Sequence, residues 1–177
     1  MMYVQNAIIP PDVELVIPGN IGFFEFLIVI GFLAHILFVN ITIGSSAMAV
    51  YQEIKAMRTK NHVHDLLAYQ LANHTSVLKS IAVVLGVAPL LIISVIYTQF
   101  FYPSTIFIGK AWLSLIIILI TAFLILYVYK FKWEDMSKHP KTKKWHVTIG
   151  FLGSLLLFFV PLIFIVNVVS MLYPTMW

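Results

Sequence analysis

Four apolar stretches occupy most of this 177-residue chain, and each is long enough to cross a lipid bilayer. A transmembrane helix needs about 20 consecutive, mostly apolar residues, because every backbone polar group must find its hydrogen bond within the segment. Hydrophobic residues make up 61% of the sequence and charged residues only 10%. The sequence therefore predicts a single domain, an all-α transmembrane four-helix bundle, with spans at residues 21–50, 77–101, 106–129 and 147–172.

The positions of lysine and arginine predict how this bundle is oriented. Ten of the eleven basic residues lie between the first and second spans, between the third and fourth spans, or just inside the second span at Lys79. The positive-inside rule assigns that side to the cytoplasm. We therefore expect both termini outside a prokaryotic plasma membrane, with residues 1–20 as an extracytoplasmic lead-in that is not a cleaved signal peptide. The net charge of +4 belongs to these loops and does not indicate a nucleic-acid partner.

The chain has no cysteine. This excludes disulfides, cysteine-ligated iron–sulfur clusters and haem attached covalently through a C-x-x-C-H motif. A redox cofactor in this chain would have to be held without covalent bonds from cysteine.

His35 is the ionisable residue nearest the middle of the first span, where an imidazole without a partner is costly. Helical periodicity places it on one face with Thr42, and Gly31 one turn earlier leaves space beside the ring. Two interpretations stay open. His35 is an axial ligand of a b-type haem, or it donates a hydrogen bond to a backbone carbonyl across a helix interface.

A second iron ligand is harder to find in the sequence. No histidine or methionine lies at the depth of His35 in the other three spans, given a rise of about 1.5 Å per residue. Lys110, near the outer end of the third span, has a stem long enough to reach towards that depth. It would ligate the iron, pair with a haem propionate, pair with Glu25, or extend to the membrane surface.

His74 and His146 lie at the inner ends of the second and fourth spans, at depths that match within about one turn. Together they could hold a second b-type haem or line a quinone pocket. The alternative is that both are interfacial histidines among the lysines of the cytoplasmic side.

Several runs resemble a known family. HILFVNITIGSSAMAVYQ, which begins at His35, resembles the first-helix signature of subunit I of the cytochrome bd quinol oxidases. SIAVVLGVAPLLI and HVTIGFLGSLLL are similar to the second and fourth spans of that subunit. The resemblance covers residues 21–177, the N-terminal four-helix part of the subunit. It implies a haem-binding bundle that exchanges electrons with quinol, with His35 as the axial ligand.

The chain also departs from that family. The acidic residues of the family's third helix are absent, and Lys110 stands about where the first of them would lie. The later haem ligands and the quinol-binding loop have no counterpart, so we do not expect this chain alone to reduce oxygen. We expect an electron-transfer subunit between the quinone pool and a partner redox subunit such as a c-type cytochrome. The alternatives are a cofactor-free structural or assembly subunit of such a complex, and a small transporter, which the absence of internal repeats disfavours.

Overall fold

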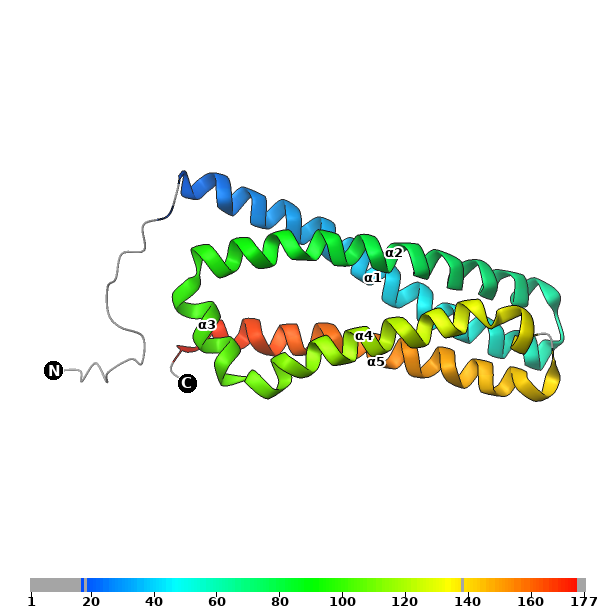
Figure 1. Cartoon of the computed structure of the whole chain (residues 1–177). Helices are drawn as coiled ribbons and strands as arrows, with labels where there is room; N and C mark the ends of the chain where they lie inside the picture. The colour runs from blue at the N-terminus through cyan, green and yellow to red at the C-terminus, as the bar shows by residue number, and fades with distance from the viewer. Residues whose placement is uncertain (1–16, 18, 138, 175–177) are drawn as a thin grey trace.

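The computed structural model describes residues 17, 19–137 and 139–174, and this part of the chain is helical with no strand (Figure 1). The four long helices are α1 (Ile21–Thr59), α2 (His62–Ile96), α4 (Gly109–Phe131) and α5 (Pro140–Leu172). A short helix, α3 (Thr98–Phe107), connects α2 to α4, and one π-helical segment, η1 (Trp133–Ser137), precedes α5.

The four long helices run up and down as two helical hairpins. α1 packs mainly against α2, and α4 packs mainly against α5. The start of α1, helix α3 and the end of α5 lie at one end of the molecule, and the α1–α2 and α4–α5 connections lie at the other (Figure 1). We call this second end the basic end, because it carries Lys60, Lys132, Lys143 and Lys144.

Each long helix is apolar enough to cross a membrane, with a mean hydropathy between 2.3 and 2.7 in its most apolar window. Large apolar side chains such as Phe26, Val84, Leu124 and Ile165 are exposed on the outside of the bundle. Lipid is the solvent that such a surface requires. The prediction of four apolar helices that can span a membrane is confirmed, and the chain is a multi-pass membrane protein.

The helices at the basic end are longer than the predicted spans. Most of residues 52–76 is helical, and only Lys60 and Asn61 separate α1 from α2. Lys60 closes α1 in the left-handed conformation, with φ 54° and ψ 28°. The Asn61 side chain accepts a hydrogen bond from the backbone N–H of Val63 at 2.9 Å, which caps the start of α2. A left-handed residue followed by an N-cap is enough to reverse the chain.

Residues 102–105, which connect the second and third predicted spans, are also helical, because they lie within α3. α3 docks onto α5 through a hydrogen bond of 3.1 Å from the buried Ser104 hydroxyl to Asn167 Oδ1. The neighbouring contact is an edge-to-face pair of Trp112 and Phe164, with ring centroids 5.3 Å apart.

The closest packing of the four helices lies towards the basic end. One buried apolar cluster contains Ala49, Val50, Ala68, Ala72, Tyr129 and Trp133, and a second contains Ala122, Leu126 and Leu157. In α1, by contrast, the first buried residue is Thr42. The first half of α1 is therefore only partly covered by the rest of the chain, and His35 lies in that half.

Candidate functional site

The imidazole of His35 is tied to α2 by a hydrogen bond between helices. Its Nδ1 lies 2.8 Å from the carbonyl oxygen of Ala82. A carbonyl oxygen only accepts, so Nδ1 carries the proton and, in the neutral ring, Nε2 keeps its lone pair. A histidine whose Nδ1–H is held by a backbone carbonyl has the tautomer that binds metals through Nε2. The same bond is the carbonyl contact that the sequence left open as the alternative.

Gly86 makes this position of the ring possible. A Cβ at residue 86 would lie 2.6 Å from His35 Cε1 and 2.8 Å from His35 Nδ1, which is too close for real atoms. Only glycine allows the imidazole to lie directly against α2. Gly86 belongs to the run SIAVVLGVAPLLI, which resembles the second span of cytochrome bd subunit I. The sequence alone did not indicate that Gly86 contacts His35.

The space expected beside the imidazole at Gly31 is filled differently. The position of a Cβ at Gly31 faces the ring of Pro89, with Pro89 Cδ at 3.5 Å. The surface of α1 at Gly31 therefore faces Pro89 of α2, and an added Cβ would make only an ordinary van der Waals contact there. Thr42 is buried, but its hydroxyl donates to the carbonyl of Phe38 in its own helix at 2.7 Å.

The structure does not bring Lys110 to His35. Lys110 lies exposed in the first turn of α4, and Glu25 lies exposed in α1. Within the described ranges neither side chain has an ion pair or a hydrogen bond. This placement agrees with a lysine that extends to the membrane surface.

His74 and His146 occupy different surroundings. His74 is exposed on α2, whereas His146 on α5 is fully buried. Both ring nitrogens of His146 are engaged, Nδ1 with Glu53 Oε1 and Nε2 with the carbonyl oxygen of Tyr129, each at 2.8 Å. No nitrogen of His146 remains for iron in this arrangement, so the second haem that the sequence suggested between these histidines has no support in the geometry.

His146 instead belongs to a buried polar cluster that the sequence did not predict. We call the side chains of Glu53, Tyr129 and His146 the inner cluster. The Tyr129 hydroxyl donates to Glu53 Oε2 at 2.8 Å, and the Tyr129 and His146 rings stack with centroids 4.4 Å apart. Trp133 closes the cluster with its ring edge-on to His146 at 4.9 Å. Three helices are therefore joined through one carboxylate.

The periodicity of α1 contains the signal for Glu53. The buried residues of α1 include Thr42, Ser46, Ala49, Glu53 and Ala56, which recur every three or four positions along one face. Glu53 continues the polar stripe of Thr42 and Ser46 beyond the predicted end of the span. Extending the helix by one turn would have placed its carboxylate inside the bundle.

The hydrogen bonds determine where the protons of the inner cluster reside. Nε2 of His146 faces a carbonyl oxygen, so it must carry a proton. A single further proton lies between Nδ1 of His146 and Oε1 of Glu53. The pair is therefore an imidazolium with a carboxylate, or an imidazole with a carboxylic acid. Both forms have zero net charge, which is what a buried site favours.

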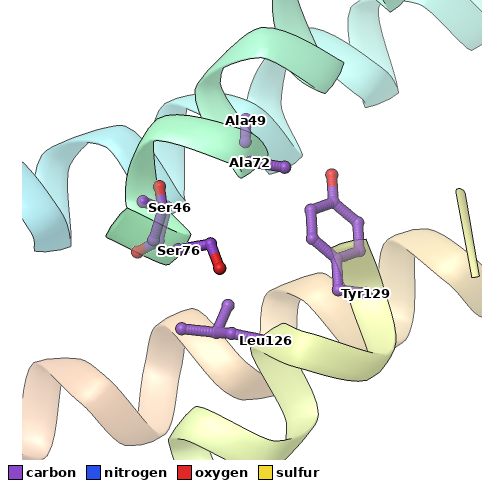
Figure 2. Close-up of a pocket in the computed structure, with 7 residues that line it drawn as sticks. Ser46, Ala49, Ala72, Ser76, Leu126 and Tyr129 are labelled. Carbon is purple, nitrogen blue, oxygen red and sulfur yellow. The ribbon is translucent and has the colours of Figure 1, made fainter. Parts of the chain in front are cut away.

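A small cavity adjoins the inner cluster (Figure 2). It lies among α1, α2 and α4 and is lined by Ser46, Ala49, Ala72, Thr75, Ser76, Leu126 and Tyr129. About 10 Å³ is available to the centre of a water molecule, close to the least that one water requires. Thr75 Oγ1 is bonded to Leu71 O and lies 2.8 Å from Ser45 Oγ, whereas the Ser76 hydroxyl has no partner among the described residues.

Lys79 is a buried cation about one helical turn from this cavity along α2. Its side chain is 1% exposed, and Nζ has no hydrogen-bond partner within the described part of the chain. The ammonium group lies 3.0 Å from the centroid of the Tyr127 ring and 5.1 Å from that of Phe123. Cation–π attraction to these rings therefore stabilises the ammonium group in place of a hydrogen-bond acceptor.

Comparisons with protein-family models, with curated proteins and with solved structures find no match to this chain.

Proposed function

We propose that this chain is a membrane cytochrome b-like subunit of a prokaryotic respiratory complex, and that His35 is the axial ligand of a non-covalent b-type haem. The observation that carries the proposal is the hydrogen bond from His35 Nδ1–H to the Ala82 carbonyl, which leaves Nε2 as a ligand nitrogen. Gly86 supports it by fixing the ring position. The resemblance of the run from His35 to cytochrome bd subunit I supports it independently.

The partial cover of α1 agrees with this role. The first buried residue of α1 is Thr42, so the first half of this helix has surface left for a further subunit to cover. Haem bound there supplies one-electron redox chemistry. The chain itself holds the ligand nitrogen and fixes its tautomer through Ala82. Among the described residues His35 would be the only ligand, because Lys110 lies at the exposed start of α4.

In this proposal the basic end faces the cytoplasm and both termini lie outside, because the lysines and arginines gather at the basic end. Electrons pass between the quinone pool and a partner redox subunit, such as a c-type cytochrome, that docks at the opposite end. The chain is an electron-transfer subunit of an oxidoreductase complex and not an enzyme alone.

The test is a reduced-minus-oxidised absorption spectrum of the purified protein and of two alanine variants. We expect a b-type band in the wild type, loss of the band in His35→Ala, and an unchanged band in His74→Ala, which removes an exposed histidine as a matched control. Circular dichroism checks that both variants remain helical. A wild-type protein with no haem by pyridine haemochrome assay, or a band that persists in folded His35→Ala, would refute the proposal.

A cofactor-free structural or assembly subunit is the second candidate, and one observation favours it. The hydrogen bond to Ala82 already satisfies the polar requirement of His35 without a cofactor. This candidate predicts that His35→Ala leaves assembly of the complex and electron flux through it intact.

A further inference from the structure

We propose that the inner cluster is a proton-holding site, and that it exchanges its proton through one water molecule in the adjoining cavity. The proposal concerns residues of this chain alone and does not depend on haem at His35. It is carried by the juxtaposition of a fully buried glutamate–histidine pair, a tyrosine hydroxyl bonded to that pair, and a small cavity lined by the same tyrosine and by three hydroxyl side chains.

The pair has room for one more proton. In the neutral pair, one proton lies between His146 Nδ1 and Glu53 Oε1, and Glu53 Oε2 accepts from Tyr129. Adding a proton at Oε2 gives a carboxylic acid beside an imidazolium, with a charge of +1. The new O–H then donates to the Tyr129 oxygen, because a phenol can accept as well as donate. The Tyr129 hydroxyl turns its own proton towards the cavity.

The cavity provides the route to Tyr129. A buried water needs two to four polar partners. Ser76 offers a free hydroxyl, the Ser46 oxygen can accept while it donates to Ile43 O, and the Tyr129 oxygen can accept while it donates to Glu53. Figure 2 shows the side chains of Ser46, Ser76 and Tyr129 around this space. One water can therefore bridge α2 to the inner cluster.

The transfer is balanced atom by atom. A proton that reaches the cavity water makes it a hydronium ion, which gives a proton to the Tyr129 oxygen. Tyr129 gives its original proton to Glu53 Oε2 and remains a neutral phenol. The water is neutral again, and Glu53 has become a carboxylic acid. Release follows the same steps in reverse.

Charged groups near the inner cluster lie on α2 and α5. Asp65 on α2 interacts electrostatically with Tyr129, but it is neutralised by Lys143 of α5, whose Nζ lies 2.6 Å and 2.7 Å from the two carboxylate oxygens. Lys79 on α2 is the unpaired cation of the buried part of this helix. The groups that interact electrostatically with Lys79 are Tyr127 and Lys130 of α4, not the residues of the inner cluster.

The experiment is infrared spectroscopy of the purified full-length protein after transfer to D2O. We expect a carboxylic-acid carbonyl band that grows as the pH falls, disappears in Glu53→Gln and shifts in Glu53→Asp. Tyr129→Phe keeps the band but slows its hydrogen–deuterium exchange by about tenfold or more, because the relay hydroxyl is lost. Tyr127→Phe is the matched control, because Tyr127 neither bonds to Glu53 nor lines the cavity within the described residues. This variant should exchange at the wild-type rate.

Three results would overturn the proposal. One is a wild-type protein with no titrating carboxylic-acid band. Another is a band that stays unchanged in folded Glu53→Gln or Glu53→Asp. The third is exchange in Tyr129→Phe that is as fast as in the wild type and in Tyr127→Phe. If Glu53→Gln does not fold, the comparison of the two tyrosine variants still decides the role of the relay.

Discussion

Glu53 and His146 are 93 residues apart in the sequence, and their Oε1 and Nδ1 atoms lie 2.8 Å apart with both side chains fully buried. This bond joins the end of the first helix to the start of the last. Tyr129 adds α4 to the same carboxylate. The inner cluster therefore holds both hairpins together at the basic end, where the larger buried apolar cluster also lies.

Removing one member of the buried pair should be strongly destabilising. Glu53→Ala leaves His146 buried without its partner and Tyr129 without its acceptor, and breaking such a pair costs about 3–5 kcal/mol of unfolding free energy. Glu25→Ala, at an exposed position of the same helix, should change it by no more than about 0.5 kcal/mol. Denaturant titration in detergent, followed by circular dichroism, measures both. Equal effects of the two variants would show that the pair does not join the helices.

Replacing both members together should cost less than replacing one. Glu53→Leu with His146→Leu removes both charges and fills the space with apolar atoms, which is often neutral or stabilising for a buried ion pair. The double variant should therefore be more stable than Glu53→Leu alone, by about 2 kcal/mol or more. A double-mutant cycle on the same denaturant titration gives the coupling between the two sites. A coupling of zero would contradict the ion-pair geometry.

An added methyl group at Gly86 should displace His35. A Cβ there would lie 2.6 Å from the imidazole, so Gly86→Ala should lower the unfolding free energy by about 1–3 kcal/mol and break the bond to Ala82. The matched control is Gly44→Ala, because a Cβ at Gly44 meets nothing within 4 Å. That variant should gain up to about 1 kcal/mol from helix propensity. If both alanine variants are equally stable, His35 does not pack on Gly86.

Lys79 should be replaceable by an apolar residue without loss of stability. Its ammonium group is buried without a hydrogen-bond partner in the described residues, and the desolvation of that charge exceeds what the Tyr127 ring returns. Lys79→Met should raise the unfolding free energy by about 1 kcal/mol. Lys132→Met, at a 57% exposed side chain paired with Asp135, should change it by about 0.5 kcal/mol or less. A large loss in Lys79→Met would indicate an anionic partner for this lysine.

The hydroxyl of Ser104 should be needed to dock α3. Ser104→Ala leaves the buried Asn167 without this donor, and an unsatisfied buried group costs about 1–3 kcal/mol. Thr98→Ala is the control, because Thr98 bonds only to backbone carbonyls at the junction of α2 and α3. Limited proteolysis between α3 and α4 reports whether α3 has detached. Proteolysis rates that match in both variants would argue against the Ser104–Asn167 contact.

The four-helix architecture could be predicted from the sequence because a transmembrane helix requires a long run of apolar residues. Long apolar runs specify the helices, and the sorting of lysines specifies which connections share an end. The positions of the helix ends were harder to predict. Beyond the bilayer a helix needs no apolar run, so the polar residues around Gln52 gave no sign that α1 continues to Thr59. The helical form of α3 was not expected either, because this helix contains Pro103 and the short connection between two predicted spans.

The residues around His35 and in the inner cluster could be predicted only in part, for a related reason. His35 was conspicuous because a lone imidazole stands out among apolar neighbours. The inner cluster was not, because Glu53 and His146 belong to segments rich in polar residues, where a buried residue looks like an exposed one. Their pairing depends on the packing of α1 against α5, which no local pattern encodes. Gly86 was seen only as part of a run, since its role is to leave room for a side chain 51 positions earlier.

The two-residue turn after α1 has a consequence for how this molecule can be handled. At about 1.5 Å per residue, the 39 residues of α1 extend about 58 Å, whereas the hydrocarbon core of a bilayer is about 30 Å thick. The α1–α2 hairpin must therefore extend well beyond the lipid. It ends in a short turn at Lys60 and Asn61, and an antibody fragment raised against this turn would give a marker for electron microscopy far from His35.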